Sequence, residues 1–265
     1  MATDYLIPES VEEALECLVA HDGRARVIAG GTDVLPDVRE GKITPECLVD
    51  ITRIPALSRI EVTDDTVNVG AAVTFAEIRE HPFFNEHVHA LGEAARSVGA
   101  AAIQNAATWA GNVVQGMPAA DGAIIAIALD AEAHIVDQSG DRWQPVESLF
   151  EGPGVSSVDP TRQMVTAIRF PHPRSRTGTA WQRVGRRSAL VLPIINCAVL
   201  VCLAPDSSAN PGQGPVTERI SRATIALGPV APRPQRMRQA ESFLSGRAPT
   251  GEAIAKAANL AAGEA

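Results

Sequence analysis

The stretch ARVIAGGTD, residues 25–33, runs from a short apolar segment straight into two adjacent glycines. The apolar segment predicts a buried strand, and the glycines predict a sharp turn at its end. Gly30 and Gly31 can adopt a positive φ, which lets successive backbone N–H groups face one concave site, and Thr32 adds a hydroxyl donor. Such a loop can hold a pyrophosphate without a lysine. The alternative is a tight strand-to-helix turn in which the glycines serve backbone geometry alone.

A second stretch of small residues, ATWAGNVVQGMPAAD at 107–121, has the composition of a ligand-binding segment. Its glycines and alanines permit close backbone approach to a ligand, and Asn112 and Asp121 supply polar groups. Asp121 also stands where a helix is expected to begin, so a role as helix N-cap is equally compatible with its position. Neither this stretch nor residues 29–33 matches the dinucleotide-binding G-x-G-x-x-G pattern or the Walker A pattern.

The first two thirds of the chain combine helical and strand patterns. Capping boxes that begin at Ser10 and at Thr74 each predict the start of a helix, and the second helix is expected to end before Pro82. The sequences RIEV and TVNVG flank a polar turn and predict a β-hairpin. Further helices are predicted over 87–98 and 121–129, and further strands at CLVDI (47–51), EAHIVD (132–137) and RWQPV (142–146).

The pattern changes beyond residues 171–178, a segment with two prolines and two arginines that is expected to be a linker. Three strands are predicted after it, at TAWQRVGRR (179–187), INCAVLVCLA (195–204) and SRATIALG (221–228). The loop DSSANPGQGP (206–215) separates the last two strands, and helices are predicted over 233–244 and 250–262. The sequence therefore predicts an α+β protein divided near residue 175.

The composition argues against several classes of function. Acidic residues outnumber basic ones by 31 to 23, and no basic stripe is available to neutralise nucleic acid phosphates. The four cysteines lack C-x-x-C spacing and the six histidines lack the spacing of zinc sites, so we expect neither a metal site nor an iron–sulfur cluster in this chain. No apolar run approaches the roughly 20 residues of a membrane span, and no signal-peptide pattern is present, which predicts a cytoplasmic protein.

The two glycine-containing loops, taken with their surroundings, resemble a known family. AGGTD after a strand, and TWAGN followed by P-x-x-D, are similar to the FAD-binding medium subunits of molybdenum hydroxylases of the xanthine dehydrogenase and carbon monoxide dehydrogenase type. The similarity continues in the family's order and spacing through LDAEAHIVDQSGDR (129–142), VTAIRFPHP (165–173), AWQRVGRR (180–187) and IALGPVAPRPQRMRQAESFLSG (225–246). The resemblance therefore covers nearly the whole chain.

The resemblance implies a fold with two domains. Residues 1–173 are expected to form a PCMH/VAO-type FAD-binding domain of two lobes, about 1–55 and 56–173, with the cofactor between them. Residues 176–265 are expected to form a small α+β domain of the CO dehydrogenase flavoprotein C-terminal type. Its three-stranded antiparallel sheet would flank the isoalloxazine.

The resemblance also implies which residues bind the cofactor. The positions that match the family's FAD contacts are Ala29, Gly30, Gly31, Thr32 and Asp33 in the first pyrophosphate loop, Thr108, Ala110, Gly111 and Asn112 in the second FAD loop, Asp121 on the adenosine or ribose side, Val165 through its main chain, and Arg183 near the flavin. Two positions depart from the family pattern. TWAGN replaces TIGGN, so Ala110 fits a glycine position only with a negative φ, and Arg183 replaces a lysine.

The function implied is electron transfer within a larger enzyme. In the family, electrons leave the substrate at a molybdenum cofactor on a large subunit, cross two [2Fe–2S] clusters on a small subunit, and reach non-covalently bound FAD on the medium subunit. The arrangement expected is a dimer of heterotrimers, with no catalytic residues or metal in this chain. The alternatives are a stand-alone flavin-dependent oxidase or dehydrogenase, and a structural subunit that has lost FAD. The sequence does not distinguish among NAD, quinone, cytochrome and oxygen as the acceptor.

Overall fold

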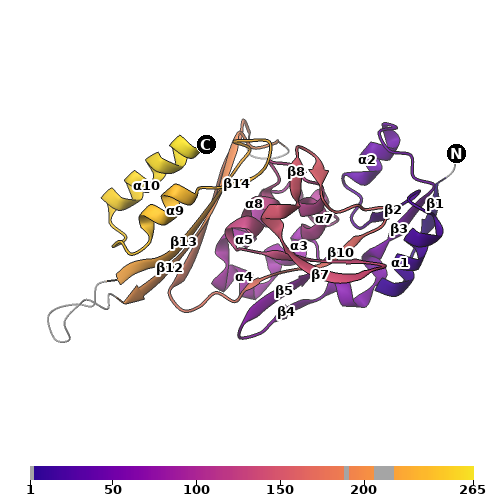
Figure 1. Ribbon diagram of the computed structural model, residues 1–265, viewed down its shortest axis with the longest axis horizontal. Coiled ribbons are helices and arrows are strands. Elements are labelled where there is room, and N and C mark those ends of the chain that lie inside the picture. Colours follow the sequence, from indigo (N-terminus) through magenta and orange to yellow (C-terminus); the bar gives the residue numbers. More distant parts are fainter. Residues whose placement is uncertain (1–2, 188–190, 206–217) are drawn as a thin grey trace.

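The computed structural model describes residues 3–187, 191–205 and 218–265, and its elements run in a row from an N-terminal sheet to a C-terminal one (Figure 1). The N-terminal sheet is parallel, in the order β1 (Asp4–Leu6), β3 (Cys47–Asp50), β2 (Ala25–Ile28). Helix α1 (Val11–Ala20) packs on this sheet through Ala14 and Leu18, which are buried with Ala25 and Cys47 in the main core. Helix α2 (Val34–Arg39) follows the glycine turn.

The central sheet has five antiparallel strands in the order β4-β5-β10-β6-β7. Helices α3, α5, α7 and α8 lie on one face of it, and their apolar side chains share the main core with those of the strands (Figure 1). The strands are β4 (Ile60–Val62), β5 (Thr66–Gly70), β6 (Glu132–Asp137), β7 (Gly140–Pro145) and β10 (Met164–Pro171). The helices are α3 (Phe75–Glu80), α4 (Pro82–His87), α5 (His89–Ser97), α6 (Ala101–Gln104), α7 (Trp109–Val114) and α8 (Asp121–Ala128).

Short elements complete this part of the chain. Three 3-10 turns, η1 (Ile51–Arg53), η2 (Pro55–Ser58) and η3 (Val146–Leu149), join longer elements. Strands β8 (Phe150–Gly152) and β9 (Val155–Ser156) form a small hairpin, which brings Val155 against Gly116 at the end of α7.

The C-terminal sheet has four antiparallel strands, so the prediction of three is wrong by one. Its order is β11 (Thr177–Val184), β12 (Ile195–Pro205), β13 (Glu218–Gly228), β14 (Gln235–Arg236). Strand β14 lies within the segment predicted as helix 233–244, and α9 begins only at Arg238 (Arg238–Leu244). Pro234 has no N–H and disfavours a helical conformation at the residue before it, which leaves Gln235 and Arg236 free to pair with β13. Helix α10 (Gly251–Glu264) packs against α9.

Helix α8 joins the central and C-terminal parts. All eight of its residues are buried, because α5 and α7 contact it on one side and strands β12 and β13 on the other. A helix covered all round must be apolar all round, which is what DGAIIAIA provides after its first residue. Trp181, Ala198 and Ala226 of the C-terminal sheet consequently belong to the same buried cluster as the central helices. The domain boundaries drawn at 173 and 176 stay predictions.

The predicted helix starts are confirmed at both capping boxes. The Ser10 side chain accepts a hydrogen bond from the Glu13 backbone at 3.1 Å, and Thr74 and Glu77 cap α3 reciprocally. The hairpin of β4 and β5 and the hairpin of β6 and β7 are also present. The predicted linker is shorter than expected because β10 extends to Pro171 and β11 starts at Thr177. The predicted loop 206–215 lies outside the described residues.

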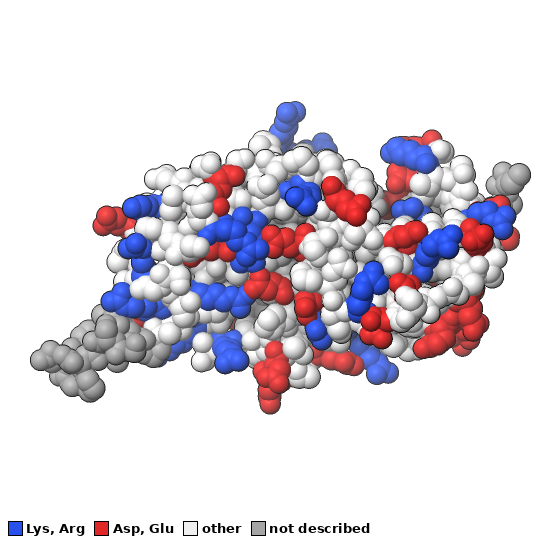
Figure 2. Space-filling view, in the orientation of Figure 1, with Lys and Arg blue, Asp and Glu red and all other residues white. Residues whose placement is uncertain are grey.

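Charges of both signs alternate over the face of the molecule seen in Figure 2. Figure 2 shows acidic and basic side chains interspersed on the face that carries the central sheet, without a continuous field of one sign. Within the described residues, no helix has both the length and the apolar character needed to cross a membrane.

Gly122, in the first turn of α8, is a site where a single methyl group should destabilise the protein. A Cβ there would lie 2.5 Å from Asn112 Oδ1 and 2.9 Å from both Phe75 and Trp109, so Gly122→Ala should cost about 1–3 kcal/mol of unfolding free energy. Gly263 in α10 has nothing within 4 Å of such a Cβ, so Gly263→Ala should leave stability unchanged or raise it by up to about 1 kcal/mol. Urea unfolding of both variants checks this; equal stability changes would contradict the packing argument.

Candidate functional site

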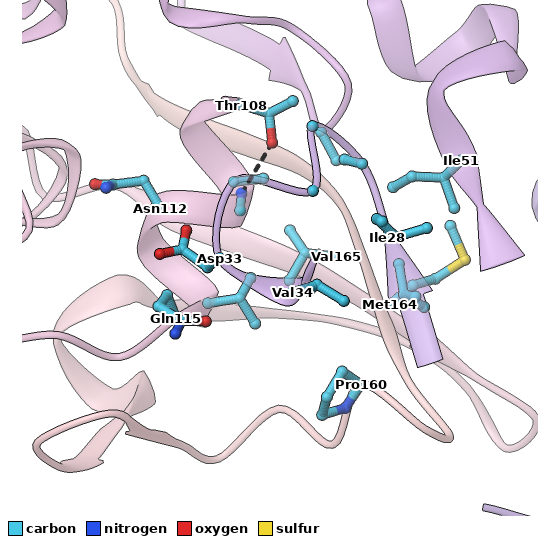
Figure 3. Close-up of a pocket in the computed structure, with 18 of the residues that line it drawn as sticks. Ile28, Asp33, Val34, Ile51, Thr108, Asn112, Gln115, Pro160, Met164 and Val165 are labelled. Atoms are coloured by element: carbon cyan, nitrogen blue, oxygen red, sulfur yellow. Dashed lines mark hydrogen bonds between the residues drawn. The ribbon is translucent and has the colours of Figure 1, made fainter. Parts of the chain in front are cut away.

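An open pocket lies where the glycine turn, α7 and the start of β10 meet. Its cavity volume is about 120 Å³, below the roughly 300–1,000 Å³ typical of small-molecule sites, because the pocket is open to solvent along its mouth. Its walls are residues 26–34, most of 107–115, and parts of 158–165. Figure 3 shows Asp33, Asn112 and Gln115 together at one end, and Ile28, Ile51 and Met164 together at the other. The pocket therefore has a polar end and an apolar end.

The glycine turn is held against the other loop by direct backbone contact. A Cβ on Gly30 would lie 1.8 Å from the Ala106 carbonyl oxygen, so no side chain fits there. Gly31 has a φ of +68°, and a Cβ on it would press on the side chains of Ile28 and Leu35. Both glycines are thus needed for backbone geometry. The same geometry exposes residues 29–33 along the pocket wall, so the structural and ligand-binding interpretations of this turn are compatible.

The second loop forms the start of α7. Thr108 is the N-cap of this helix, and its hydroxyl oxygen accepts a hydrogen bond from the Gly111 backbone at 3.1 Å (Figure 3). Ala110 lies inside the helix and has no positive φ, so alanine satisfies the condition set for this position. Thr108, Ala110, Gly111 and Asn112 all line the pocket.

Asn112 connects the pocket to helix α8. Its side-chain oxygen accepts a hydrogen bond from the Gly122 backbone at 2.9 Å, which satisfies one of the free N–H groups at the start of α8. Trp109, one turn earlier in α7, does not face the pocket: it is fully buried, donates from Nε1 to the Gly122 carbonyl at 2.8 Å, and packs edge-on against Phe170. The tryptophan in TWAGN is therefore a core residue.

Asp121 lies with Arg183 rather than at the pocket wall. The N-cap of α8 is Ala120 and Asp121 is the first helical residue, so the N-cap alternative is wrong. Its carboxylate accepts a hydrogen bond from Asn196 Nδ2 at 2.8 Å, and Arg183 Nε is 3.4 Å away. Burial raises the pKa of Asp121, although the Asn196 hydrogen bond and the Arg183 charge oppose that shift. Arg183 also donates to the Val191 carbonyl.

The strand before the glycine turn contributes a residue that the motif-based prediction missed. Arg26 lines the pocket, and its Nε is buried without a hydrogen-bond partner among the described residues. Burial lowers the pKa of Arg26, which Asp37 and Asp159 partly offset. The sequence did contain a signal for Arg26. Side chains alternate between the two faces of a strand, so Arg26 lies on the same face of β2 as Ile28, the last residue before the turn. Val165, predicted as a main-chain contact to the cofactor, also lines the pocket.

Metal binding finds no support in the part of the chain that the structure describes. No group of three or more His, Cys, Asp or Glu side chains there is arranged to hold a metal ion.

Comparison with known proteins defines the class of protein first. Residues 1–173 match the family described as the FAD binding domain in molybdopterin dehydrogenase, and residues 180–265 match the CO dehydrogenase flavoprotein C-terminal domain. The chain belongs to this family of FAD-binding dehydrogenase subunits. The family resemblance predicted from the sequence is confirmed, as is its implication that the chain is an oxidoreductase subunit with an FAD-binding domain.

Particular relatives agree with this assignment. The chain is 30% identical to the carbon monoxide dehydrogenase medium chain of Hydrogenophaga pseudoflava, over 97% of this chain and 85% of the relative. It is 31% identical to a putative xanthine dehydrogenase FAD-binding subunit of Escherichia coli, over 84% and 73% of the two chains. The solved carbon monoxide dehydrogenase from H. pseudoflava that lacks the Mo-pyranopterin moiety superposes with a TM-score of 0.86 at 29% identity, covering 98% of this chain and 86% of that one.

The buried carboxylate of Asp121 should give stability a distinctive pH dependence. Because its pKa is raised in the folded protein above the usual aspartate value of about 4, the folded state binds this proton more tightly than the unfolded state. Its contribution to stability therefore increases as the pH falls from 7 toward about 4. We expect the unfolding free energy of the wild type to rise relative to Asp121→Asn over this acidification, measured by urea unfolding. A difference that stayed constant, or shrank, would contradict the assigned direction.

Proposed function

We propose that the pocket between the glycine turn and α7 holds FAD non-covalently, and that this chain passes electrons from [2Fe–2S] clusters of a partner subunit to an external acceptor. The observation that carries the proposal is the backbone contact at Gly30, which brings residues 29–33 and 107–112 together as two walls of one pocket. FAD supplies the electron-carrying chemistry when it is bound. The protein binds and orients it.

The residues present fit such a cofactor. Backbone N–H groups of the glycine turn and the Thr32 hydroxyl suit a pyrophosphate, and the orphaned Nε of Arg26 is a buried donor in the same pocket. The main chain at Val165 supports a further contact through the opposite wall. Arg183 would lie near the flavin, and Asp121, which the resemblance assigns to the adenosine or ribose side, lies 3.4 Å from Arg183 at the junction with the C-terminal sheet. The roles of Thr32, Val165, Asp121 and Arg183 come from the family resemblance, and the place of Arg26 comes from the structure.

The proposed partners are a small [2Fe–2S] subunit and a large molybdopterin subunit, assembled as a dimer of heterotrimers. Support comes from relatives named as medium chains or FAD subunits, and from a structural relative whose molybdenum cofactor lacks one moiety. A cytoplasmic location stays a prediction.

A charge placed at residue 32 tests where the pyrophosphate lies. Thr32→Glu puts a carboxylate beside the proposed site, whereas Thr32→Gln adds a neutral side chain of nearly the same size. Repulsion between the carboxylate and the pyrophosphate should raise the FAD dissociation constant of Thr32→Glu at least about tenfold above that of Thr32→Gln, equivalent to about 1.4 kcal/mol. Titration of flavin-stripped protein at low and high salt measures this ratio, which should shrink as salt screens the charge. Equal affinities of the two variants would show that the pyrophosphate does not lie beside residue 32.

Acid treatment tests non-covalent attachment, because covalent linkage requires a nearby nucleophile such as His or Cys and neither occurs in 29–33 or 107–121. Acid precipitation of the purified protein should release all of the yellow flavin into the supernatant. Flavin retained in the pellet would contradict this.

The same purified protein also tests whether substrate oxidation takes place on the partner subunits. Dithionite should reduce its flavin, while carbon substrates should reduce it only slowly until the iron–sulfur and molybdenum subunits are added. Rapid reduction by a substrate of the lone chain would instead support the stand-alone oxidase, and absence of bound flavin would support the structural-subunit alternative.

A further inference from the structure

The face of the central sheet opposite the helices carries a stacked set of polar and aromatic side chains. His134 in β6 stacks on Trp143 in β7 with ring centroids 4.7 Å apart, and the guanidinium carbon of Arg169 in β10 lies 3.8 Å from the Trp143 ring centre. Glu132 pairs with Arg169 at 2.8 Å. The neighbouring residues Ile135 and Ile168 point to the core, as the alternation of a strand requires.

His134 links this outer face to the interior through two hydrogen bonds. Its Nε2 lies 2.9 Å from the Asp141 carboxylate, and its Nδ1 lies 2.6 Å from the Thr166 hydroxyl. Because a carboxylate only accepts, Nε2 donates to Asp141. In the neutral imidazole, which has one N–H, Nδ1 then accepts from the Thr166 hydroxyl. Asp141 therefore determines which hydrogen bond His134 can make to Thr166.

Thr166 is the extra residue of a β-bulge in β10. Val165 pairs with Ile135 and Ala167 with His134, so Thr166 has no partner residue on β6. Its carbonyl oxygen accepts a hydrogen bond from the Ala71 backbone at 2.9 Å. Ala71 and Val165 both line the cofactor pocket. The bulge thus shapes the pocket wall. Thr166 itself is buried, with its hydroxyl 2.6 Å from His134 Nδ1.

We propose that His134, oriented by Asp141 and acting through Thr166, is a positioning residue for the pocket wall at Val165 and Ala71. A β-bulge beside a binding site can change the direction of neighbouring residues. Here His134 holds the bulged residue Thr166 from the face of the sheet opposite the helices. The inference rests on the proposed function, since it assigns these residues to the FAD pocket. The chain's own hydrogen-bonding pattern carries the inference, because neither His134 nor Thr166 lies in the two motif loops.

Two variants each remove the same hydrogen bond. His134→Phe keeps the stacking on Trp143, and Thr166→Val keeps the shape of the bulged residue. Each should raise the FAD dissociation constant of the full-length, flavin-stripped chain about fivefold to tenfold, as expected for one buried hydrogen bond. Thr166→Val also removes the longer bond from the Thr166 hydroxyl to the His134 carbonyl at 3.4 Å. The double variant should therefore bind no more weakly than Thr166→Val alone, because both changes remove the contact between the His134 ring and Thr166. Thr166→Ser, which retains the hydroxyl, should bind FAD as the wild type does.

Glu132→Gln is the matched control. It weakens the ion pair with Arg169 on the same outer face without touching Thr166, so its FAD affinity should equal that of the wild type. If it weakens FAD binding as much as His134→Phe does, the effect belongs to the whole sheet and the positioning role is refuted. If the wild type binds FAD and both Thr166→Val and His134→Phe bind it equally well, the inference fails while the proposed function stands. Failure of the wild type to bind FAD overturns both.

Discussion

Helix α8 has both faces covered, and that constraint organises the rest of the molecule. Because it contacts α5 and α7 on one side and β12 and β13 on the other, it can carry polar groups only at its ends. Those ends hold the polar contacts that join the parts: Asn112 and Asn196 meet its first turn, and Thr224 donates to the Ala128 carbonyl at its last. The position of the C-terminal sheet is therefore coupled through α8 to α7, the helix that forms one wall of the pocket.

Close backbone contacts determine the shape of the pocket. Gly30 allows one loop to touch the Ala106 carbonyl, and Gly111 leaves room at the first turn of α7. The charged side chains that line it are Arg26, on the strand side, and Asp33, in the glycine turn. A site of this kind recognises a ligand by the direction of its N–H groups and by shape, and charge plays a secondary part.

Much of this could be predicted from sequence, since local signals determine local structure. The capping boxes at Ser10 and Thr74, the hairpins and the glycine turn all depend on neighbours within a few residues. Strand β14 could not be predicted, because two residues become a strand only by pairing with Ala226 and Leu227. The partners of Asp121 could not be predicted either, because Asn196 and Arg183 lie far from it in the sequence. Family motifs indicated that Asp121 is important but not which side chains surround it.

The contact between Gly30 and Ala106 also limits how this protein can be redesigned. Two loops that touch through main-chain atoms cannot exchange volume as packed side chains do, so neither tolerates an insertion unless the other moves with it. Engineering for a different flavin would have to leave these loops alone. The adjustable wall is the one formed by Arg26, Pro160 and Met164, where side chains line the space and can be enlarged, shortened or recharged one at a time.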